Sequence, residues 1–193
     1  PANLLLSHER IILNLIQRLC GITTLTTEYV NKLNNNMIKI LDTRKTTPGL
    51  RLFEKYAVHI GGGYNHRLDL SHGIMLKDNH LVLINNLEQV LYDIKAHHPT
   101  KKIQIEIDYF DQLTQNIKHH FPVDAILLDN MTRQQTIECV DYIKERWPQC
   151  FIESSGGINL NNIQNYIDTG IDAISIGALT HQAVSKNIKL EFK

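Results

Sequence analysis

The sequence has no excess of charge of either sign. Its 193 residues include 20 Lys and Arg against 20 Asp and Glu, so the formal net charge is zero. A neutral chain produces no overall field that would attract nucleic acid or an anionic membrane surface. We therefore expect neither as a partner, and any cluster of positive charge on one face would be a local, specific feature.

Cysteine is also scarce, and features that direct proteins to membranes are missing. Cys20, Cys139 and Cys150 are odd in number and widely spaced, which matches neither a disulfide framework nor a zinc-binding pattern. No apolar stretch approaches the ~18 residues of a membrane span, and no basic segment followed by an apolar one marks a secretory leader. These absences predict a cytoplasmic protein with reduced cysteines. The chain begins with Pro1 rather than Met, so we expect a fragment or a processed form.

The chain does contain seven short apolar runs, each followed by residues that carry chemistry. Such runs are typical of buried parallel strands. The predicted strands are Met37–Thr43, Ala57–Gly61, Gly73–Leu76, Ile103–Ile107, Ala125–Leu128, Phe151–Ser154 and Ala173–Ile176. The predicted helices are Leu87–Lys95, Tyr109–His119, Arg133–Glu145, Asn161–Thr169 and a long one over Ser7–Leu33, capped by Ser7 with Gly21 as a point of breakage.

The alternation of strands and helices predicts an α/β fold in which crossover units form a parallel sheet. About seven strands favour a TIM-like β/α barrel, closed or nearly closed and preceded by the long helix, although a doubly wound open sheet is an alternative. We expect residues 1–36 to form a helical segment that packs on the barrel and at a subunit interface. Residues 37–193 would form the barrel, whose reactive groups lie at the carboxyl ends of the strands.

The densest cluster of polar groups follows the first predicted strand. Arg44 and Lys45 stand among three threonines and a Pro48-Gly49 turn. Arginine binds carboxylate or phosphate through paired hydrogen bonds, whereas lysine acts as a compact charge. Two cations alone would fit a solvated basic turn, but with the hydroxyls and the turn they predict an anion site. Lys45 could alternatively be a Schiff-base amine, which needs a desolvated pocket.

Further charged residues follow the next predicted strands. His66 and Arg67 come after three consecutive glycines, and Lys77 follows the third strand. Glu106 and Asp129 belong to the fourth and fifth strand ends, where two carboxylates suit Mg²⁺ held through water and a substrate phosphate. They could instead neutralise nearby lysines, and either interpretation places them in the site.

The last two predicted strands are each followed by a glycine turn. These turns contain Ser155, Gly156 and Gly157 after one strand, and Gly177 with His181 after the other. Barrels commonly bind phosphate in the loops after their final strands, where main-chain N–H groups are available. Phosphate binding is therefore the firmest functional prediction from the residues themselves. Phosphorylated sugars, aldolase-type cleavage and glycosyl transfer all fit such a site.

The chain resembles the quinolinate phosphoribosyltransferases over its whole length. The string Thr43-Arg-Lys-Thr-Thr-Pro-Gly-Leu-Arg51 is the most specific match. The matching stretches, in the family's order, are His8–Asn14, Cys20–Ile22, Leu41–Arg51, Glu54–Ala57, Gly61–Gly63, Asn65–Arg67, Lys77–His80, Leu128–Met131, Ser155–Ile158 and Ile176–His181. In place of the family's usual Glu-Val-Glu-Val-Glu pattern the chain has Gln104, Glu106 and Asp108, so only the central carboxylate is fully retained.

The resemblance implies conversion of quinolinate and phosphoribosyl pyrophosphate, with Mg²⁺, to nicotinate mononucleotide, pyrophosphate and carbon dioxide in the synthesis of NAD. It implies a homodimer or a larger assembly, up to a hexamer. It also implies an additional N-terminal α/β domain, so that the match covers the barrel domain alone. By motif position, the pocket for quinolinate would comprise Arg44, Lys45, His66, Arg67 and Lys77.

The remaining implied roles concern the ribose, the metal and the partner subunit. Glu106 and Asp129 would hold the ribose hydroxyls and, through water, the Mg²⁺–pyrophosphate. The ribose phosphate would lie against Ser155, Gly156, Gly157 and Gly177, with His181 close by. Arg10 would reach a neighbouring subunit's site, and Lys45 or Lys77 would assist decarboxylation.

Three other interpretations fit parts of the sequence. One is a phosphate-binding lyase or aldolase that uses Lys45 or Lys77 as a Schiff base. Another is a truncated barrel that binds anions or partners without turnover. The third is a molybdenum-associated homologue of the same family, which the full set of pocket cations disfavours.

Overall fold

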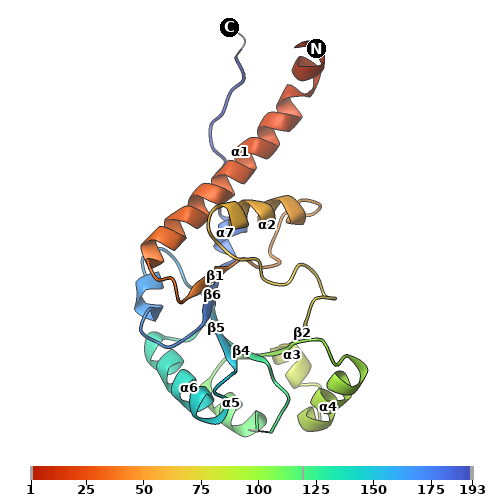
Figure 1. Cartoon of the computed structure of the whole chain (residues 1–193), viewed down its shortest axis with the longest axis vertical. Coiled ribbons are helices and arrows are strands. Elements are labelled where there is room, and N and C mark those ends of the chain that lie inside the picture. The colour runs from red at the N-terminus through yellow and green to blue at the C-terminus, as the bar shows by residue number, and fades with distance from the viewer. Residues whose placement is uncertain (1, 119, 192–193) are drawn as a thin grey trace.

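The computed structural model describes residues 2–118 and 120–191, and its centre is a parallel sheet with the strand order β1-β6-β5-β4-β3-β2. The strands are β1 (Lys39–Leu41), β2 (Ile74–Leu76), β3 (Ile103–Ile107), β4 (Ala125–Asp129), β5 (Phe151–Ser155) and β6 (Ala173–Ser175). They follow an arc from β1 to β2 with α5 and α6 on its outer side (Figure 1). The α/β class with a parallel sheet is thus confirmed, with six strands in place of about seven.

The predicted second strand, Ala57–Gly61, is wrong because these residues form the end of helix α2 (Arg51–Ile60) and its C-cap. A short apolar run cannot be assigned to strand or helix from periodicity alone. The chain returns to the sheet a few residues later, where Tyr64 forms a parallel bridge with Leu41. The Tyr64 N–H donates to Ile40 O at 2.7 Å. This short segment lies beside β1, on the open side of the arc.

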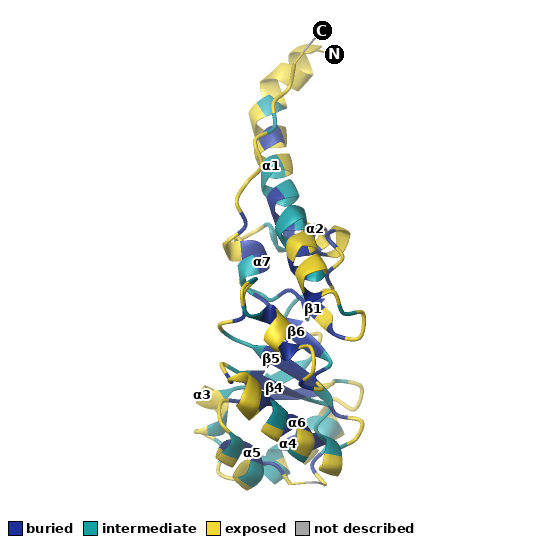
Figure 2. Ribbon diagram, turned by 90° about the vertical axis from the view of Figure 1, so that its left-hand side faces the viewer, coloured by how far each residue is buried: buried dark blue, intermediate teal, exposed yellow. Residues whose placement is uncertain are grey.

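Helix α1 (Ala2–Leu33) is longer than predicted and passes unbroken through Gly21. Gly21 instead allows the main chain at Val184 to lie close to the helix, because a Cβ on Gly21 would lie 2.2 Å from Val184 O. The C-terminal segment runs beside this helix, and Gln17 Nε2 donates to Ile188 O at 2.7 Å. Figure 2 shows the N-terminal half of α1 extending, largely exposed, away from the sheet. No helix in the described part of the chain is both long and apolar enough to cross a membrane.

The other predicted helices have mixed outcomes. Helices α4 (Leu87–His97) and α6 (Arg133–Arg146) are confirmed, whereas α5 (Phe110–Asn116) is shorter than Tyr109–His119, whose last residue lies outside the described residues. The stretch Asn161–Thr169 contains only the 3-10 turn η1 (Ile163–Tyr166). Two short helices, α3 (Asp78–Leu81) and α7 (Ala178–His181), were not predicted.

The core lies between the sheet and its helices. Ile105, Ile126 and Ile152 stand in register on adjacent strands and are fully buried or nearly so. The C-terminal half of α1 buries Ile22 and Leu33 against this body. The expected boundary at residue 36 falls between α1 and β1, and the subunit interface assigned to residues 1–36 stays a prediction.

Candidate active site

A cavity of ≈ 700 Å³ opens at the carboxyl ends of the strands. It brings together residues that are distant in the sequence, because most of them stand at or just after the carboxyl ends of strands, while His66 and Arg67 follow helix α2. Those predicted from the sequence and found in its lining are Arg44, Lys45, His66, Arg67, Lys77, Glu106, Asp129, Ser155, Gly156, Gly157, Gly177 and His181. Arg10 is exposed in the extended part of α1 and belongs to another region.

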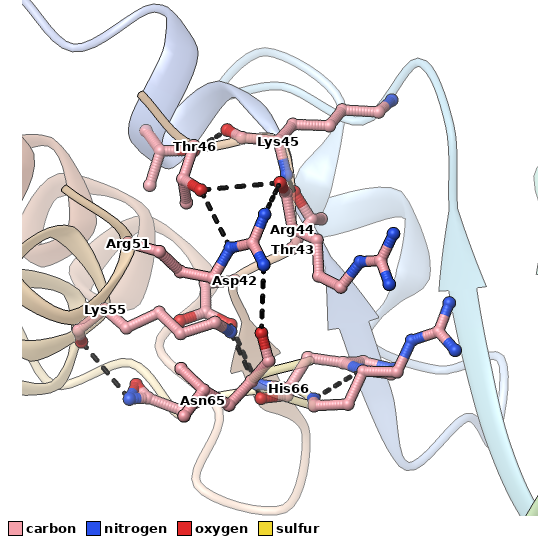
Figure 3. Close-up of polar contacts among 12 residues, drawn as sticks. Asp42, Thr43, Arg44, Lys45, Thr46, Arg51, Lys55, Asn65 and His66 are labelled. Atoms are coloured by element: carbon pink, nitrogen blue, oxygen red, sulfur yellow. Dashed lines mark hydrogen bonds and ion pairs between the residues drawn. The ribbon is translucent and has the colours of Figure 1, made fainter. Parts of the chain in front are cut away.

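The turn that carries Arg44 and Lys45 is rigidly held through its main chain. Arg51 donates from Nε to Thr46 Oγ1 at 3.0 Å and from Nη2 to Arg44 O at 3.3 Å (Figure 3). On the other side, Thr180 Oγ1 donates to Lys45 O at 2.6 Å. Because none of these contacts uses the Arg44 or Lys45 side chain, the two cationic side chains are left to line the cavity.

A buried ion pair missed by the sequence analysis holds the segment that carries His66. Lys55 of α2 forms an ion pair with Asp42, and both side chains are almost fully buried. Asp42 Oδ1 accepts from His66 N–H at 2.8 Å, and Lys55 Nζ donates to His66 O at 3.1 Å (Figure 3). Burial raises the pKa of Asp42 and lowers that of Lys55, while the attraction within the pair opposes both shifts.

Arg67 is the residue after His66, and the surroundings of its guanidinium disfavour the positive charge. Burial lowers the pKa of Arg67, and the nearby positive charge of Arg44 lowers it further. The carboxylates of Glu106 and Glu153 oppose these effects. Two guanidinium groups that repel one another across a cavity would be stabilised by an anion placed between them.

Carboxylates near the carboxyl ends of β3 and β4 also line the cavity. Lys77 Nζ donates to Glu106 Oε2 at 2.5 Å. Burial raises the pKa of Glu106, the Lys77 ammonium counteracts this shift, and the charges of Asp129 and Asp108 add to it. The cavity thus holds charges of both signs: Arg44 follows β1, whereas Glu106 and Asp129 stand near the carboxyl ends of β3 and β4.

The donor set around these carboxylates is compatible with one mode of Mg²⁺ binding. Within the two described ranges, no three His, Cys, Asp or Glu side chains gather as a ready ligand set. Mg²⁺ in phosphate-processing sites is commonly bound by one or two carboxylates, with waters and substrate phosphates completing the shell. Glu106 and Asp129 fit that pattern, in which the phosphate would come with the substrate.

The glycine turns form the third wall. Gly156 has φ +81°, and a Cβ there would lie 2.2 Å from Asn130 Oδ1. A Cβ on Gly177 would approach Lys45 Cδ at 3.0 Å and His181 Nε2 at 3.1 Å. A side chain cannot be accommodated at Gly156 and would crowd Lys45 and His181 at Gly177, so the main chain itself borders the cavity, which suits the binding of a phosphate by N–H groups.

Sequence reasoning missed three charged residues that support the site: Asp42, Lys55 and Glu153. Glu153 stands in the middle of β5 with its side chain 1% exposed. A carboxylate inside an apolar strand was the available signal, because such a group is costly to bury without partners. Lys55 gave no comparable signal, since a lysine within a helix is ordinarily solvated.

The fold and this cavity define a β/α-barrel-type domain with a site for strongly anionic ligands. The family model described as "Quinolinate phosphoribosyl transferase, C-terminal domain" matches residues 22–191, and the chain belongs to this family. A probable nicotinate-nucleotide pyrophosphorylase [carboxylating] of Bacillus subtilis (strain 168) is 44% identical over 193 residues, which are 99% of this chain and 65% of that protein. The corresponding protein of Mycobacterium leprae is 40% identical over 97% of this chain and 65% of its own length.

Solved structures agree with this assignment. NadC from Streptococcus pyogenes superimposes with a TM-score of 0.86 and 42% identity, covering 95% of this chain and 63% of that one. Nicotinate-nucleotide pyrophosphorylase from Ehrlichia chaffeensis gives a TM-score of 0.83 and 36% identity over 92% and 63%. The chain therefore spans slightly less than two thirds of the length of these relatives.

Proposed function

We propose that this chain forms the active-site domain of an enzyme that transfers the phosphoribosyl group of phosphoribosyl pyrophosphate to quinolinate. The reaction includes decarboxylation and yields nicotinate mononucleotide, pyrophosphate and carbon dioxide for NAD synthesis. The observation that carries the proposal is one cavity lined by arginines, by two carboxylates and by two glycine turns. The names of the relatives support the same reaction.

Quinolinate would bind through its carboxylates at the cationic wall. Arg44 and Arg67 repel each other, and a dianion between them removes that repulsion. Lys45 adds a third positive charge at the same wall. Fixing both carboxylates orients the ring nitrogen toward the ribose, which converts the encounter into a positioned reaction.

The carboxylate wall would stabilise the transition state of phosphoribosyl transfer. Departure of pyrophosphate leaves positive charge on the ribose ring, and Glu106 and Asp129 supply fixed negative charge close to it. Mg²⁺, when bound between these carboxylates and the pyrophosphate, would neutralise the leaving group. The ribose phosphate would lie on the glycine turns at Gly156 and Gly177.

Loss of carbon dioxide leaves a carbanion-like ring carbon, which a nearby ammonium group stabilises. Lys45 and Lys77 both line the cavity and are candidates. Lys77 is already paired with Glu106, whereas Lys45 belongs to the wall assigned to quinolinate. This difference favours Lys45 for contact with the substrate ring, and Lys77 for holding Glu106.

We also propose that the functional protein is a homodimer or a larger homo-oligomer. Arg10 lies in the exposed, extended part of α1, away from this chain's own cavity. An arginine assigned to substrate binding by its motif would from there act in the site of a second subunit. Light scattering should detect a dimer or a larger assembly of the complete protein. A preparation in which every subunit carries Arg10→Ala should be inactive. Both results would support this arrangement.

The experiment that tests the activity measures carbon dioxide and nicotinate mononucleotide formed from quinolinate, phosphoribosyl pyrophosphate and Mg²⁺. This chain and the complete gene product would be assayed side by side, with nicotinate as the control acceptor. Activity of the complete protein, with none from nicotinate, is the expected result. A correctly folded complete protein without activity would refute the proposed reaction.

A further inference from the structure

Glu153 is a buried carboxylate to which the proposed mechanism gives no role. It stands in the centre of β5 with its side chain 1% exposed, and its Oε2 atom lies 3.1 Å from His66 Nε2 and 2.8 Å from Gln104 Nε2. Burial alone would raise the pKa of Glu153, but hydrogen bonds from His66 and Gln104 oppose this effect and the pKa is lowered. The group is therefore a carboxylate anion at neutral pH.

The hydrogen bonds of His66 determine which ring nitrogen carries the proton. The Arg67 main-chain N–H donates to His66 Nδ1 at 2.7 Å, so Nδ1 must offer its lone pair. The proton of the neutral ring then sits on Nε2, from which it is donated to Glu153. A carboxylate, which only accepts, enforces this tautomer, whereas an amide in its place could also donate to Nε2.

The His66 main chain is held as firmly as its ring. Asp42 accepts from its N–H, and Lys55 donates to its carbonyl oxygen. The ring therefore connects the barrel interior to the peptide N–H of Arg67, the next residue. Arg67 in turn extends into the cavity, where its Nη2 atom lies 3.3 Å from Met75 Sδ.

We propose that Glu153 is a positioning residue for substrate binding: it fixes the Nε2–H tautomer of His66, and this ring holds the main chain of Arg67 at the cationic wall. The inference deepens the proposed function and rests on Arg67 binding a quinolinate carboxylate. It assigns His66 to the support of Arg67, since both of its ring nitrogens are engaged with the protein. The negative charge of Glu153 also counteracts the repulsion that Arg67 experiences from Arg44.

The test uses Glu153→Gln in the complete protein, which preserves side-chain shape but removes the charge and allows donation to His66. We expect the KM for quinolinate to rise about 10- to 100-fold, as for other displaced substrate-orienting groups. The KM for phosphoribosyl pyrophosphate should stay within about twofold, because its contacts are on other walls. Nitrogen-15 NMR of the histidine rings, with His66 assigned by the signal lost in His66→Gln, should change from the Nε2–H tautomer to a mixture.

Gln104→Met is the matched control. Gln104 donates to the same carboxylate oxygen but is outside the lining of the ≈ 700 Å³ cavity; it borders a smaller one of ≈ 290 Å³, together with His66, Arg67 and Glu153. This variant should lower the melting temperature while leaving the tautomer and the quinolinate KM unchanged. An equal rise of KM in both variants, or an Nε2–H ring that persists in Glu153→Gln, would overturn the inference. The tautomer decides it even if the wild type proves inactive on quinolinate, an outcome that would refute only the proposed reaction.

Discussion

In the protein without ligand, the surroundings of the cavity disfavour the charged forms of some of its side chains. Burial and the charge of Arg44 lower the pKa of Arg67, and burial with the charges of Asp129 and Asp108 raises the pKa of Glu106. Each of these groups would gain from a bound partner of opposite charge. Such arrangements are common at functional sites, where complementarity to a ligand is favoured over the stability of the unliganded protein.

At the scale of one residue, Lys45→Ala is expected to abolish measurable turnover and leave the fold intact. The side chain is exposed in the cavity, and the turn is held through the Lys45 carbonyl oxygen, which the variant retains. The free energy of unfolding should change by less than about 0.5 kcal/mol, as for other exposed substitutions. The measurements are steady-state product formation and thermal unfolding, with the exposed Lys32→Ala as control. Normal activity of Lys45→Ala would contradict its assignment to the substrate site.

A second single-residue prediction concerns pH. Asp108 lies outside the assigned site, but its negative charge raises the pKa of Glu106. Asp108→Asn removes that charge, so the pKa of Glu106 falls and the carboxylate persists to lower pH. Since the proposed mechanism needs ionised Glu106, the acid limb of the kcat/KM profile should move to lower pH.

The control for this shift is Asp111→Asn, which changes an exposed carboxylate in the following helix α5. It should leave the acid limb in place. An acid limb that stays unmoved in Asp108→Asn, or moves to higher pH, would show that another group sets it.

At the scale of elements, the C-terminal segment depends on one position of α1. Gly21 lies where Val184 O approaches to 2.2 Å of an added Cβ. Within a helix alanine is favoured over glycine by about 1 kcal/mol, so an isolated helix would gain from the substitution. Here the backbone of the C-terminal segment would have to move.

We therefore expect Gly21→Ala to destabilise the protein by about 1–3 kcal/mol, the usual range for overpacking a close contact. Denaturant unfolding of the variant and of Asn31→Ala, an exposed position of the same helix, makes the comparison. Asn31→Ala should be neutral or slightly stabilising. Stabilisation by Gly21→Ala would mean that the C-terminal segment does not pack on α1 in solution.

At the scale of the whole molecule, Asp124 links helix α4 to the amino ends of two strands. Its carboxylate accepts from Lys95 Nζ at 2.7 Å, Lys102 Nζ at 2.8 Å and Ile103 N–H at 2.9 Å. Burial by itself raises the pKa of Asp124, but these three donors outweigh it and hold the pKa below its ordinary value. A lowered folded-state pKa stabilises the protein above the unfolded pKa, and this contribution is lost as the pH falls through the folded value.

Asp124→Asn should consequently lower the free energy of unfolding by about 1–3 kcal/mol at pH 7, the usual effect of losing hydrogen bonds to a charged group. The difference from wild type should diminish as the pH is lowered through the folded-state pKa of Asp124. Denaturant unfolding at a series of pH values measures it. A difference that stays constant down to the most acid pH would contradict the assigned linkage.

The positions of most cavity side chains were predictable from the sequence because they stand at the carboxyl ends of parallel strands; His66 and Arg67, which follow helix α2, are the exception. In a parallel sheet the carboxyl ends of the strands meet at one edge, so residues such as Arg44, Glu106 and Asp129 had to converge once their strands were recognised. The motifs and their order along the chain also identified the family. Only Arg10 was placed elsewhere, because it lies on a helix that extends beyond the sheet.

What only the tertiary structure decided is the support beneath those side chains and the open form of the sheet, in which β1 and β2 are the end strands. The pairs Asp42–Lys55 and His66–Glu153 join residues from different elements with no periodic relation between them, so the sequence could not show which side chains would pair. The run Ala57–Gly61 forms a helix end rather than a strand, and it packs closely on α1, where a Cβ on Gly61 would lie 2.6 Å from Thr26 Cβ. The sequence by itself determined which chemical groups surround the cavity, whereas packing determined how they are held there.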